Sequence, residues 1–320
     1  MPPKYLTILV LALSVAVLSA CEPDPPPAKG EDPMIEWMKG QINCPKQADH
    51  MPKPDPQGMV LFEQAQAIEK SLLDVAMMRW HPQIDQAIDL YKQSAARGNP
   101  LAMNNLANIY YYGNGVDSDE KESLRWVNQM YAQNTPMGDY TMGLAYAKGL
   151  GGLPRDRDKA RELYIKAAKR GNPEALYVLA NSSLSPETFT TVNRMLQCAI
   201  DQGHKEAASA LALNHEVMKD YTKSLRATRA GAKLGHPICL ENLAMGYERD
   251  PTNLRAQDFS WFGLRQDKQR AECLYKLERE VRELPGYDGW RDPEVAFPDL
   301  DERCPPNVEQ PPGLELSPTM

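Results

Sequence analysis

The ionisable side chains of this chain fall in patterns that argue against catalysis. His215 is followed by Glu216, but the second histidine that completes a zinc-protease helix is missing four residues later. His204 and His236 lie 32 residues apart at one phase of a repeat, which favours two structural copies over a ligand role. With five histidines and no Cys-x-x-Cys pair, the sequence predicts no metal site.

Two further motifs have a simpler explanation than a reaction site. Residues 149–152, Gly-Leu-Gly-Gly, suggest a phosphate loop, but no strand precedes them, and a tight turn after a helix explains them better. Asp117, Asp119, Glu120 and Glu122 form an acidic turn, which is either a solvated entry to a helix N-terminus or the rim of an interaction surface. The chain also lacks a Gly-x-Ser-x-Gly motif and a P-loop. We therefore predict no catalytic residues, no cofactor and no small-molecule substrate.

Aromatic residues give a better indication of a binding role. Tyr111 and Tyr112 are adjacent on a predicted helix, and exposed tyrosines are frequent interface anchors, although one of the two rings could instead pack on the next turn. Trp261 and Phe262 cannot both face one core, and Trp290 lies in a loop; for these three, core and interface roles both remain open. The candidate partner-binding residues are Tyr111, Tyr112, Asp117, Asp119, Glu120, Trp261, Phe262 and Trp290.

The composition is that of a globular protein with an acidic surface. The chain has 320 residues, of which 42% are hydrophobic and 25% charged, enough for a large core. Its formal net charge is -7, from 36 Lys and Arg against 43 Asp and Glu. A nucleic-acid binder would show a basic stripe instead, so we expect a protein partner and no nucleic acid.

The first residues have the pattern of a secretory signal. Lys4 is followed by sixteen uncharged, mostly apolar residues, 5–20, a run shorter than the roughly 20 residues of a membrane-spanning helix. A short anchor helix that is kept is the alternative. The composition changes again further on, because residues 22–57 hold nine prolines and residues 285–320 hold eight, against eight in the 227 residues between.

The end of this apolar run suggests a lipid anchor. Leu18, Ser19, Ala20 and Cys21 resemble the lipobox of bacterial lipoproteins, in which the peptide is cut before a cysteine that carries diacylglycerol. Glu22 stands where an aspartate would imply retention in the inner membrane, so the resemblance implies the outer membrane. Several acyl chains on Cys21 would anchor the protein stably on the periplasmic side, with no other contact to the membrane.

Five cysteines follow the predicted cleavage point, and in an oxidising periplasm they could pair. Because five is odd, at least one stays free or pairs outside the chain. Cys44 and Cys304 lie in irregular flanks and could meet, and Cys239 and Cys273 lie on candidate neighbouring helices. Alternatively, the helical cysteines, Cys198 among them, are small buried hydrophobes.

A repeat organises the middle of the chain. Gly98, Asn134, Gly171, Gly203 and Gly235 each separate two helical patterns, at spacings of 36, 37, 32 and 32 residues. Glycine or asparagine ends a helix in the left-handed conformation, and a proline two residues later suits the first turn of the next helix.

Apolar residues recur at helical spacing on both sides of each repeat marker, as Ile84, Ala87 and Ile88 do before the first. A pair of helices cannot bury its apolar face alone, so neighbouring pairs must stack. The sequence therefore predicts an all-α, right-handed α-solenoid of helical hairpins, with a capping helix over residues 62–78 and extended Pro-rich flanks. The predicted divisions are a signal peptide at 1–20, a Pro-rich tether at 21–57, the solenoid at 58–250, and a C-terminal helix with a Pro-rich tail at 251–320.

One repeat resembles a known family closely. Ala102, Leu106, Tyr110, Gly113, Gly115 and Val116 match the pattern A-x-x-x-L-G-x-x-Y-x-x-G-x-G-V of the Sel1-like, TPR-like repeat. Tyr111 and Tyr112 occupy positions that this family usually fills with polar residues. The resemblance is specific over residues 84–182 and fades over 183–250, where the spacing drops and the glycine loop is missing.

The end of the chain carries a second resemblance. Residues 261–270, a helix to Glu283, and the segments 292–295 and 297–301 before Pro305 resemble the tail of Sel1-type lipoproteins of proteobacteria. Several of these are immunity proteins that bind type VI secretion lipase effectors, notably phospholipases, in the periplasm. The resemblance implies that this chain binds and inhibits such an effector. The alternative is an adaptor or scaffold lipoprotein in envelope assembly or signalling.

Overall fold

The computed structural model describes residues 33–40, 42–53, 55–72, 82–249, 262–284, 296–308 and 310. All regular structure in these residues is helical, as the sequence predicts. The chain divides into two compact units, residues 1–40 and 41–320. Helix α2 (Pro33–Lys39) belongs to the first unit, and everything below concerns the second.

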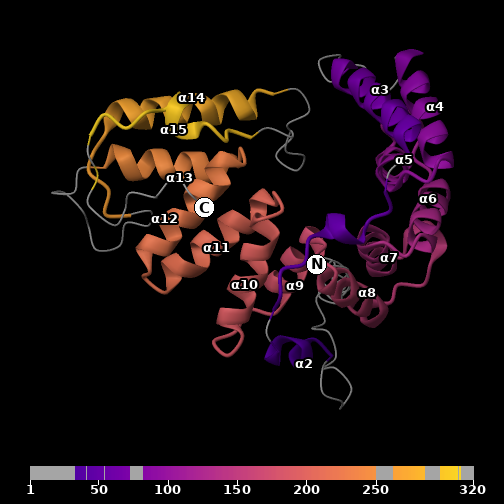
Figure 1. The fold of residues 1–320 in the computed structure, drawn as a ribbon, viewed down its shortest axis with the longest axis horizontal. Helices are drawn as coiled ribbons and strands as arrows, with labels where there is room; N and C mark the ends of the chain where they lie inside the picture. Colours follow the sequence, from indigo (N-terminus) through magenta and orange to yellow (C-terminus); the bar gives the residue numbers. More distant parts are fainter. Residues whose placement is uncertain are drawn as a thin grey trace, which may run out of the picture. The chain divides into compact units, whose positions relative to one another are not determined.

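The second unit is a row of helical hairpins (Figure 1). Consecutive helices pack as the pairs α3/α4, α5/α6, α7/α8, α9/α10, α11/α12 and α13/α14. We call the odd-numbered helices α5 to α13, which follow the repeat markers, the A helices, and the even-numbered helices from α4 to α14 the B helices. Their bounds are α3 Pro56–Leu72, α4 Pro82–Ala96, α5 Pro100–Tyr112, α6 Glu120–Ala132, α7 Pro136–Lys148, α8 Arg157–Lys169, α9 Pro173–Ser182, α10 Phe189–Ile200, α11 Lys205–Val217, α12 Tyr221–Lys233, α13 Pro237–Glu248 and α14 Lys268–Arg282. Short elements complete the unit: η1 Gln47–His50, η3 Leu150–Gly152 and α15 Leu300–Arg303.

The five repeat markers confirm the predicted turns. Gly98, Asn134, Gly171, Gly203 and Gly235 all adopt positive φ, between 53° and 90°. The residue after each marker is the N-cap of an A helix, and its side chain accepts a backbone N–H of the first turn. These N-caps are Asn99, Thr135, Asn172, His204 and His236. The two histidines are therefore structural copies of the other caps, as their spacing predicts.

The B helices begin in a second repeated way. Asp119, Asp156, Asp220 and Asp267 are the N-caps of α6, α8, α12 and α14. The backbone N–H of each donates to a carbonyl near the end of the preceding A helix, at 2.8 to 3.0 Å. The aspartate thus fixes both the start of its own helix and the position of the hairpin partner.

A core cluster of side chains from α3 to α8 holds the first hairpins together. Close backbone approach is part of this packing: a Cβ at Gly115 would lie 2.2 Å from Cγ1 of Ile84. Gly143 is also restricted, because a Cβ there would lie 2.8 Å from the ring of Tyr164. An ion group around a buried carboxylate then ties α7 to α8, since the fully buried Asp139 accepts from the partly exposed Lys166 at 2.7 Å and also pairs with an arginine of the α8 end.

The segment before α3 is fastened to the later part of the array. Cys44 forms a disulfide with Cys198 of α10, 154 residues away. The backbone N–H of Gln47 donates to Oε1 of Gln202 at 2.8 Å. The part of the predicted tether, residues 21–57, that the structure describes contains the short helices α2 and η1 and is not extended throughout, while residues 21–32 lie outside the described residues. Proline occupies the first turn or the approach to these short helices, where its missing N–H costs nothing.

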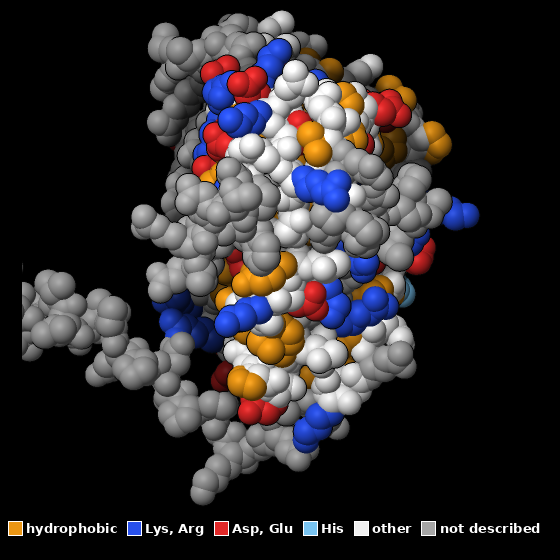
Figure 2. All heavy atoms as spheres, turned by 90° about the vertical axis from the view of Figure 1, so that its left-hand side faces the viewer, with side chains coloured by type: hydrophobic (Ala, Val, Ile, Leu, Met, Phe, Trp, Pro, Cys, Tyr) orange, Lys and Arg blue, Asp and Glu red, His pale blue; other side chains and the backbone are white. Residues whose placement is uncertain are grey.

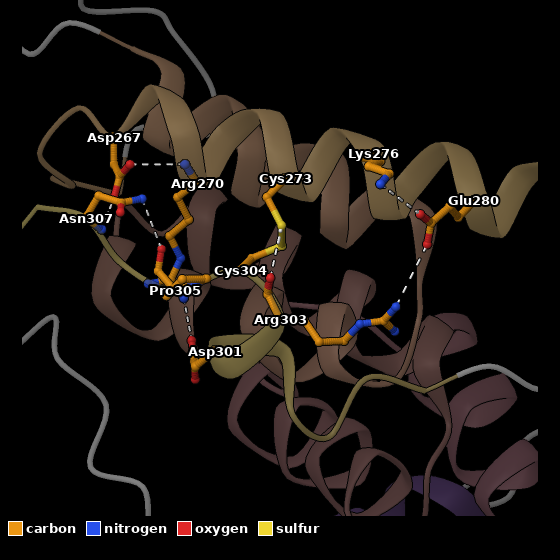
Figure 3. The surroundings of a disulfide bond; sticks show 10 residues. All are labelled: Asp267, Arg270, Cys273, Lys276, Glu280, Asp301, Arg303, Cys304, Pro305 and Asn307. Atoms are coloured by element: carbon orange, nitrogen blue, oxygen red, sulfur yellow. Dashed lines mark hydrogen bonds and ion pairs between the residues drawn. A yellow bond between two sulfur atoms is a disulfide. The ribbon is translucent and has the colours of Figure 1, made fainter.

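A C-terminal clasp closes the other end (Figure 3). Cys273 of α14 forms a disulfide with Cys304, which directly follows α15. Asp301 of α15 pairs with Arg229 of α12 at 3.0 Å and with Arg270 of α14. The α14 helix and the tail therefore lie side by side, and the tail contributes to the apolar core that α12, α13 and α14 share.

Ion pairs of Asp301 hold the C-terminal tail against α12 and α14. Burial would raise the pKa of Asp301, but Arg229, Arg270 and Lys233 together hold it below its usual value. Asp267 strengthens the same contact, because its second carboxylate oxygen accepts the backbone N–H of Asn307 at 2.7 Å (Figure 3).

Neither of the predicted cysteine pairs forms. Cys44 does not meet Cys304, because the N-terminal segment reaches the middle of the array at Cys198 while the tail folds back on α14. Cys239 does not meet Cys273 and is the free, buried thiol among the described cysteines. Burial raises its pKa to about 12, so it packs as a small hydrophobe.

Candidate protein-binding surface

Tyr111 and Tyr112 lie together at the end of α5. Their rings meet edge to face at 4.8 Å between centroids. Tyr111 packs under Lys148 of α7, whose Nζ lies 4.4 Å from the ring centroid and donates to the hydroxyl at 3.2 Å. Tyr112 is 54% exposed. The structure thus covers one tyrosine and presents the other, which is one of the two arrangements that the sequence allows.

The acidic turn is mainly an entry to a helix. Asp119 accepts the backbone N–H groups of Lys121 and Glu122, and Glu120 accepts the N–H of Gly151 at 3.1 Å. Asp117 lines an open pocket of about 530 Å³ beside this turn. Two of the three predicted acidic residues are therefore occupied in holding helix and loop, which favours the solvated-turn reading over an interaction rim.

The aromatic candidates at the other end of the chain do not join this group. Phe262 is 3% exposed and packs close to Gly246 in the apolar core of the last hairpin, so it is a core residue and we remove it from the candidate surface. Trp261 and Trp290 lie outside the described residues, as does Cys21. The roles of these three residues stay predictions.

A surface that the sequence reading missed lies on the later A helices. Helix α11 contacts both α9 and α13, so these A helices run next to one another. On α11 and its turn, Leu213, Val217 and Met218 are 56%, 69% and 60% exposed, and Ile238 of α13 is 49% exposed. Exposed aliphatic side chains grouped on neighbouring helices are typical of interaction sites. Figure 2 shows one face of the molecule, on which hydrophobic side chains are interspersed with Lys, Arg, Asp and Glu side chains.

The turn that carries Met218 has unusual backbone geometry. Lys219 has a φ of 59°, in the left-handed region that favours glycine. The A helices α5 and α7 end with Gly113 and Gly149 in this conformation, at φ of 70° and 73°. In the later repeat a lysine takes up the left-handed conformation in a shorter turn, which stores strain next to the exposed methionine.

Charge separates the two kinds of helix in this region. The A helices α9, α11 and α13 carry five glutamates and one lysine. Their hairpin partners, the B helices α10, α12 and α14, carry ten Lys and Arg and three acidic residues. The exposed apolar side chains of the later A helices thus have an acidic background.

Comparison with known proteins agrees with this repeat structure. The model of the Sel1 repeat matches residues 82–99, 100–134 and 137–172. The chain contains Sel1 repeats. The matches stop where the glycine loop disappears, so the helices from α9 to α13 continue the hairpin pattern beyond the matched Sel1 repeats.

Solved structures resemble more of the chain than its Sel1 repeats. Immunity protein PA5088 from Pseudomonas aeruginosa is 26% identical, with a TM-score of 0.60 over 82% of this chain and 93% of that one. Immunity protein Pa5087 from the same organism is 24% identical, with a TM-score of 0.63 over 83% and 94%.

The exopolysaccharide production negative regulator of Rhizobium meliloti is 32% identical over 116 residues, which are 32% of this chain and 43% of that protein. The chain spans between 35% and 59% of the length of three curated relatives that it matches.

The described residues around the Sel1 repeats hold no group of three or more His, Cys, Asp or Glu side chains placed to bind a metal ion. Perturbed groups have structural causes: burial raises the pKa of Tyr140, and burial raises that of Tyr164 to about 12, in a stack that joins α7 to α8. The fold is shared with solved immunity and Sel1 repeat proteins. In the described part of the chain, no helix is both long and apolar enough to cross a bilayer.

Proposed function

We propose that this chain is an immunity protein that binds and neutralises a lipase or phospholipase delivered by type VI secretion. The likeness to immunity protein PA5088 carries the proposal. It extends over 82% of this chain, a share too large for the repeat region alone, and over 93% of the immunity protein. The tail resembles that of immunity lipoproteins, which supports the same conclusion.

The architecture suits inhibition by binding alone. The hairpins are fixed by repeated caps, an ion group around a buried carboxylate and two disulfides, so the array meets its partner with little conformational entropy left to lose. A rigid helical surface of this size can cover an active site or hold a lid in place without any chemistry of its own. Neutralisation then requires a large, slowly dissociating interface.

We further propose that the protein works in the periplasm and that lipid on Cys21 anchors it to the outer membrane. The two disulfides support this, because such bonds persist in oxidising compartments. A strain expressing the chain should incorporate radiolabelled palmitate into it, and Cys21→Ser should abolish the label and release the protein from the outer-membrane fraction. Label retained in Cys21→Ser would contradict the anchor.

A competition between sibling cells tests the immunity function. The parent strain, with an active type VI system, attacks a strain that lacks this chain. We expect the deletion strain to lose viability by at least tenfold relative to the parent as prey, and a plasmid copy of the chain to restore survival. Attackers without a working secretion apparatus are the control. Equal survival of deletion strain and parent would refute the proposal.

The second candidate is an adaptor in envelope assembly or signalling. The likeness to the exopolysaccharide production negative regulator of Rhizobium meliloti favours it. In that case the deletion strain should show an envelope or polysaccharide defect when grown without attackers, and the competition should leave it unharmed. The same two strains therefore separate the two functions.

A further inference from the structure

We propose that the toxin docks on an apolar surface of the later A helices, made by Leu213, Val217, Met218 and Ile238, and that the docking part of the toxin is an apolar surface bordered by Lys and Arg. This inference rests on the proposed function and deepens it, because it names the face and the chemistry of the partner. It places the site outside the matched Sel1 repeats.

The four side chains belong to one stretch of neighbouring helices. Leu213 and Val217 are four residues apart and share one face of α11, and Met218 follows directly. Ile238 lies in the first turn of α13, which contacts α11, at the repeat position that Glu206 holds at the start of α11; it therefore marks the opposite end of this surface from Val217 and Met218. Each of the four is about half exposed or more. Burying such side chains is favourable in proportion to the apolar area removed from water, so their exposure offers a partner a contact area.

In the matched Sel1 repeats, the side chains at the equivalent positions are less exposed or polar. Leu101 and Met137 stand three residues after their markers, as Ile238 does, yet both are half-buried and pack against the core cluster of the first hairpins. Asn108 and Leu144 stand where Leu213 does; the first is polar and the second is half-buried. The exposure of large aliphatic side chains is therefore a property of the later repeats and not of the repeat pattern.

The backbone of the α11–α12 turn holds two of these side chains outward. Lys219 keeps the left-handed conformation without glycine, and the N–H of Asp220 donates to the carbonyl of His215 at 2.8 Å. The turn 218–220 is shorter than the glycine loop 113–119, so fewer residues are available to fold back over Val217 and Met218. Strain held at one position beside exposed apolar residues is consistent with a binding role.

Charge complementarity selects the partner. Glu206 and Glu216 lie on α11, and Glu241 and Glu248 on α13, on the helices that carry the apolar side chains. Lys205 is the one Lys or Arg side chain within α9, α11 and α13, and Lys219 stands in the turn directly after Met218, so glutamate still outnumbers Lys and Arg on these helices and this turn. A partner with Lys and Arg around an apolar centre matches this acidic background, is steered toward it, and is discriminated from acidic surfaces.

Sibling competition also tests this inference. Cells carry the chain with Val217→Ser and Met218→Ser together, or with Val60→Ser as the matched control, because Val60 on α3 is 51% exposed and lies away from α11. We expect the double variant to lose at least tenfold in survival under attack, and Val60→Ser to protect like the natural chain. Ile238→Ser provides a second, independent variant. Thermal melts of the purified proteins verify that all remain folded.

The outcomes separate this inference from the proposed function. If the natural chain gives no protection, the function itself fails. If the natural chain protects and both the double variant and Ile238→Ser protect equally well, the docking surface is wrong. If Tyr112→Ala alone loses protection, the site lies at the end of α5 and the inference is overturned.

Two substitutions at one position test the partner's charge. Val217→Lys should weaken protection more than Val217→Asp, because a bordering Lys or Arg of the toxin repels the first and attracts the second. The reverse order would overturn the basic border. Light scattering of the purified chain tests another occupant: a dimer that the serine variants dissociate while protection is unchanged would assign this surface to a second copy of the chain.

Discussion

Residues 82–172 and residues 173–249 belong to one array of hairpins but end their A helices differently. In the first stretch, α5 and α7 end at Gly113 and Gly149, and glycine-containing loops lead on to the B helices. In the second, α11 ends in the three-residue turn 218–220 with a left-handed lysine. The caps change as well, from Asn99, Thr135 and Asn172 to two histidines.

The consequence of this difference is visible on the surface. In the first stretch, the loops and their glycines pack back onto the hairpins, and equivalent apolar side chains are half-buried. In the second, the short turn leaves aliphatic side chains exposed. Regular repeats thus serve stability, and departures from the repeat pattern mark the part of the array that is free to take on a specific role.

The largest effect should come from the disulfide that fastens the N-terminal segment to the second stretch. With Cys44→Ser and Cys198→Ala, we expect the free energy of unfolding to fall by about 4 kcal/mol, because the bond closes a loop of 154 residues in the unfolded chain. Urea denaturation measures the change. The shorter loop of Cys273–Cys304, 31 residues, should contribute about 1 kcal/mol less. An unchanged midpoint in the first variant would show that the segment adds nothing to the array.

Two glycines of the first stretch separate packing from backbone conformation. Gly115→Ala should destabilise by about 2–4 kcal/mol, since its Cβ would collide with Ile84 and its φ is +80°. Gly152→Ala should cost only about 1 kcal/mol, because φ is +93° but no atom lies within 4 Å of a Cβ there. Equal losses in thermal or urea unfolding would mean that loop packing does not distinguish the first stretch.

Local sequence patterns predict much of the array. A left-handed marker, a capping residue and a proline recur at fixed spacing, so the positions of the turns at Gly98 and Gly235 are set by neighbours in sequence. The signal is equally readable at Asp119, whose capping role follows from its place before a helix.

The rest depends on contacts between distant segments, which no local rule provides. Cys44 lies in a proline-rich stretch with several possible partners, and only the path of the chain along the array brings it to Cys198. Exposure is likewise a property of the assembled helices: Leu213 and Leu144 hold the same repeat position, yet one is exposed and the other half-buried. The sequence therefore indicates the aromatic residues as candidates for binding, whereas the exposed aliphatic surface can be recognised only in the folded structure.

The lysine at the turn offers a smaller and opposite test. Lys219→Gly should stabilise the protein by about 0.5–1 kcal/mol, because glycine adopts the left-handed conformation without a Cβ penalty. Lys219→Ala, which keeps the Cβ, is the matched control and should give no gain. Stabilisation by both variants would point to the lysine charge instead of the backbone, and would remove one support for a specialised turn.

The smallest expected effect is a pH dependence confined to the second stretch. Burial lowers the pKa of His215 on α11, an effect that Asp220 opposes by raising it and Lys223 reinforces by lowering it. The unfolded chain therefore binds a proton at His215 more readily than the folded chain does, so the free energy of unfolding should fall as the pH drops below about 6.5. Denaturation at several pH values should show a weaker dependence for His215→Asn than for the natural chain, while His50→Asn, at an exposed site on η1, should follow the natural chain. Parallel curves for all three proteins would mean that His215 is as free to take up a proton in the folded state as in the unfolded one, and that the end of α11 tolerates a charge that its burial should exclude.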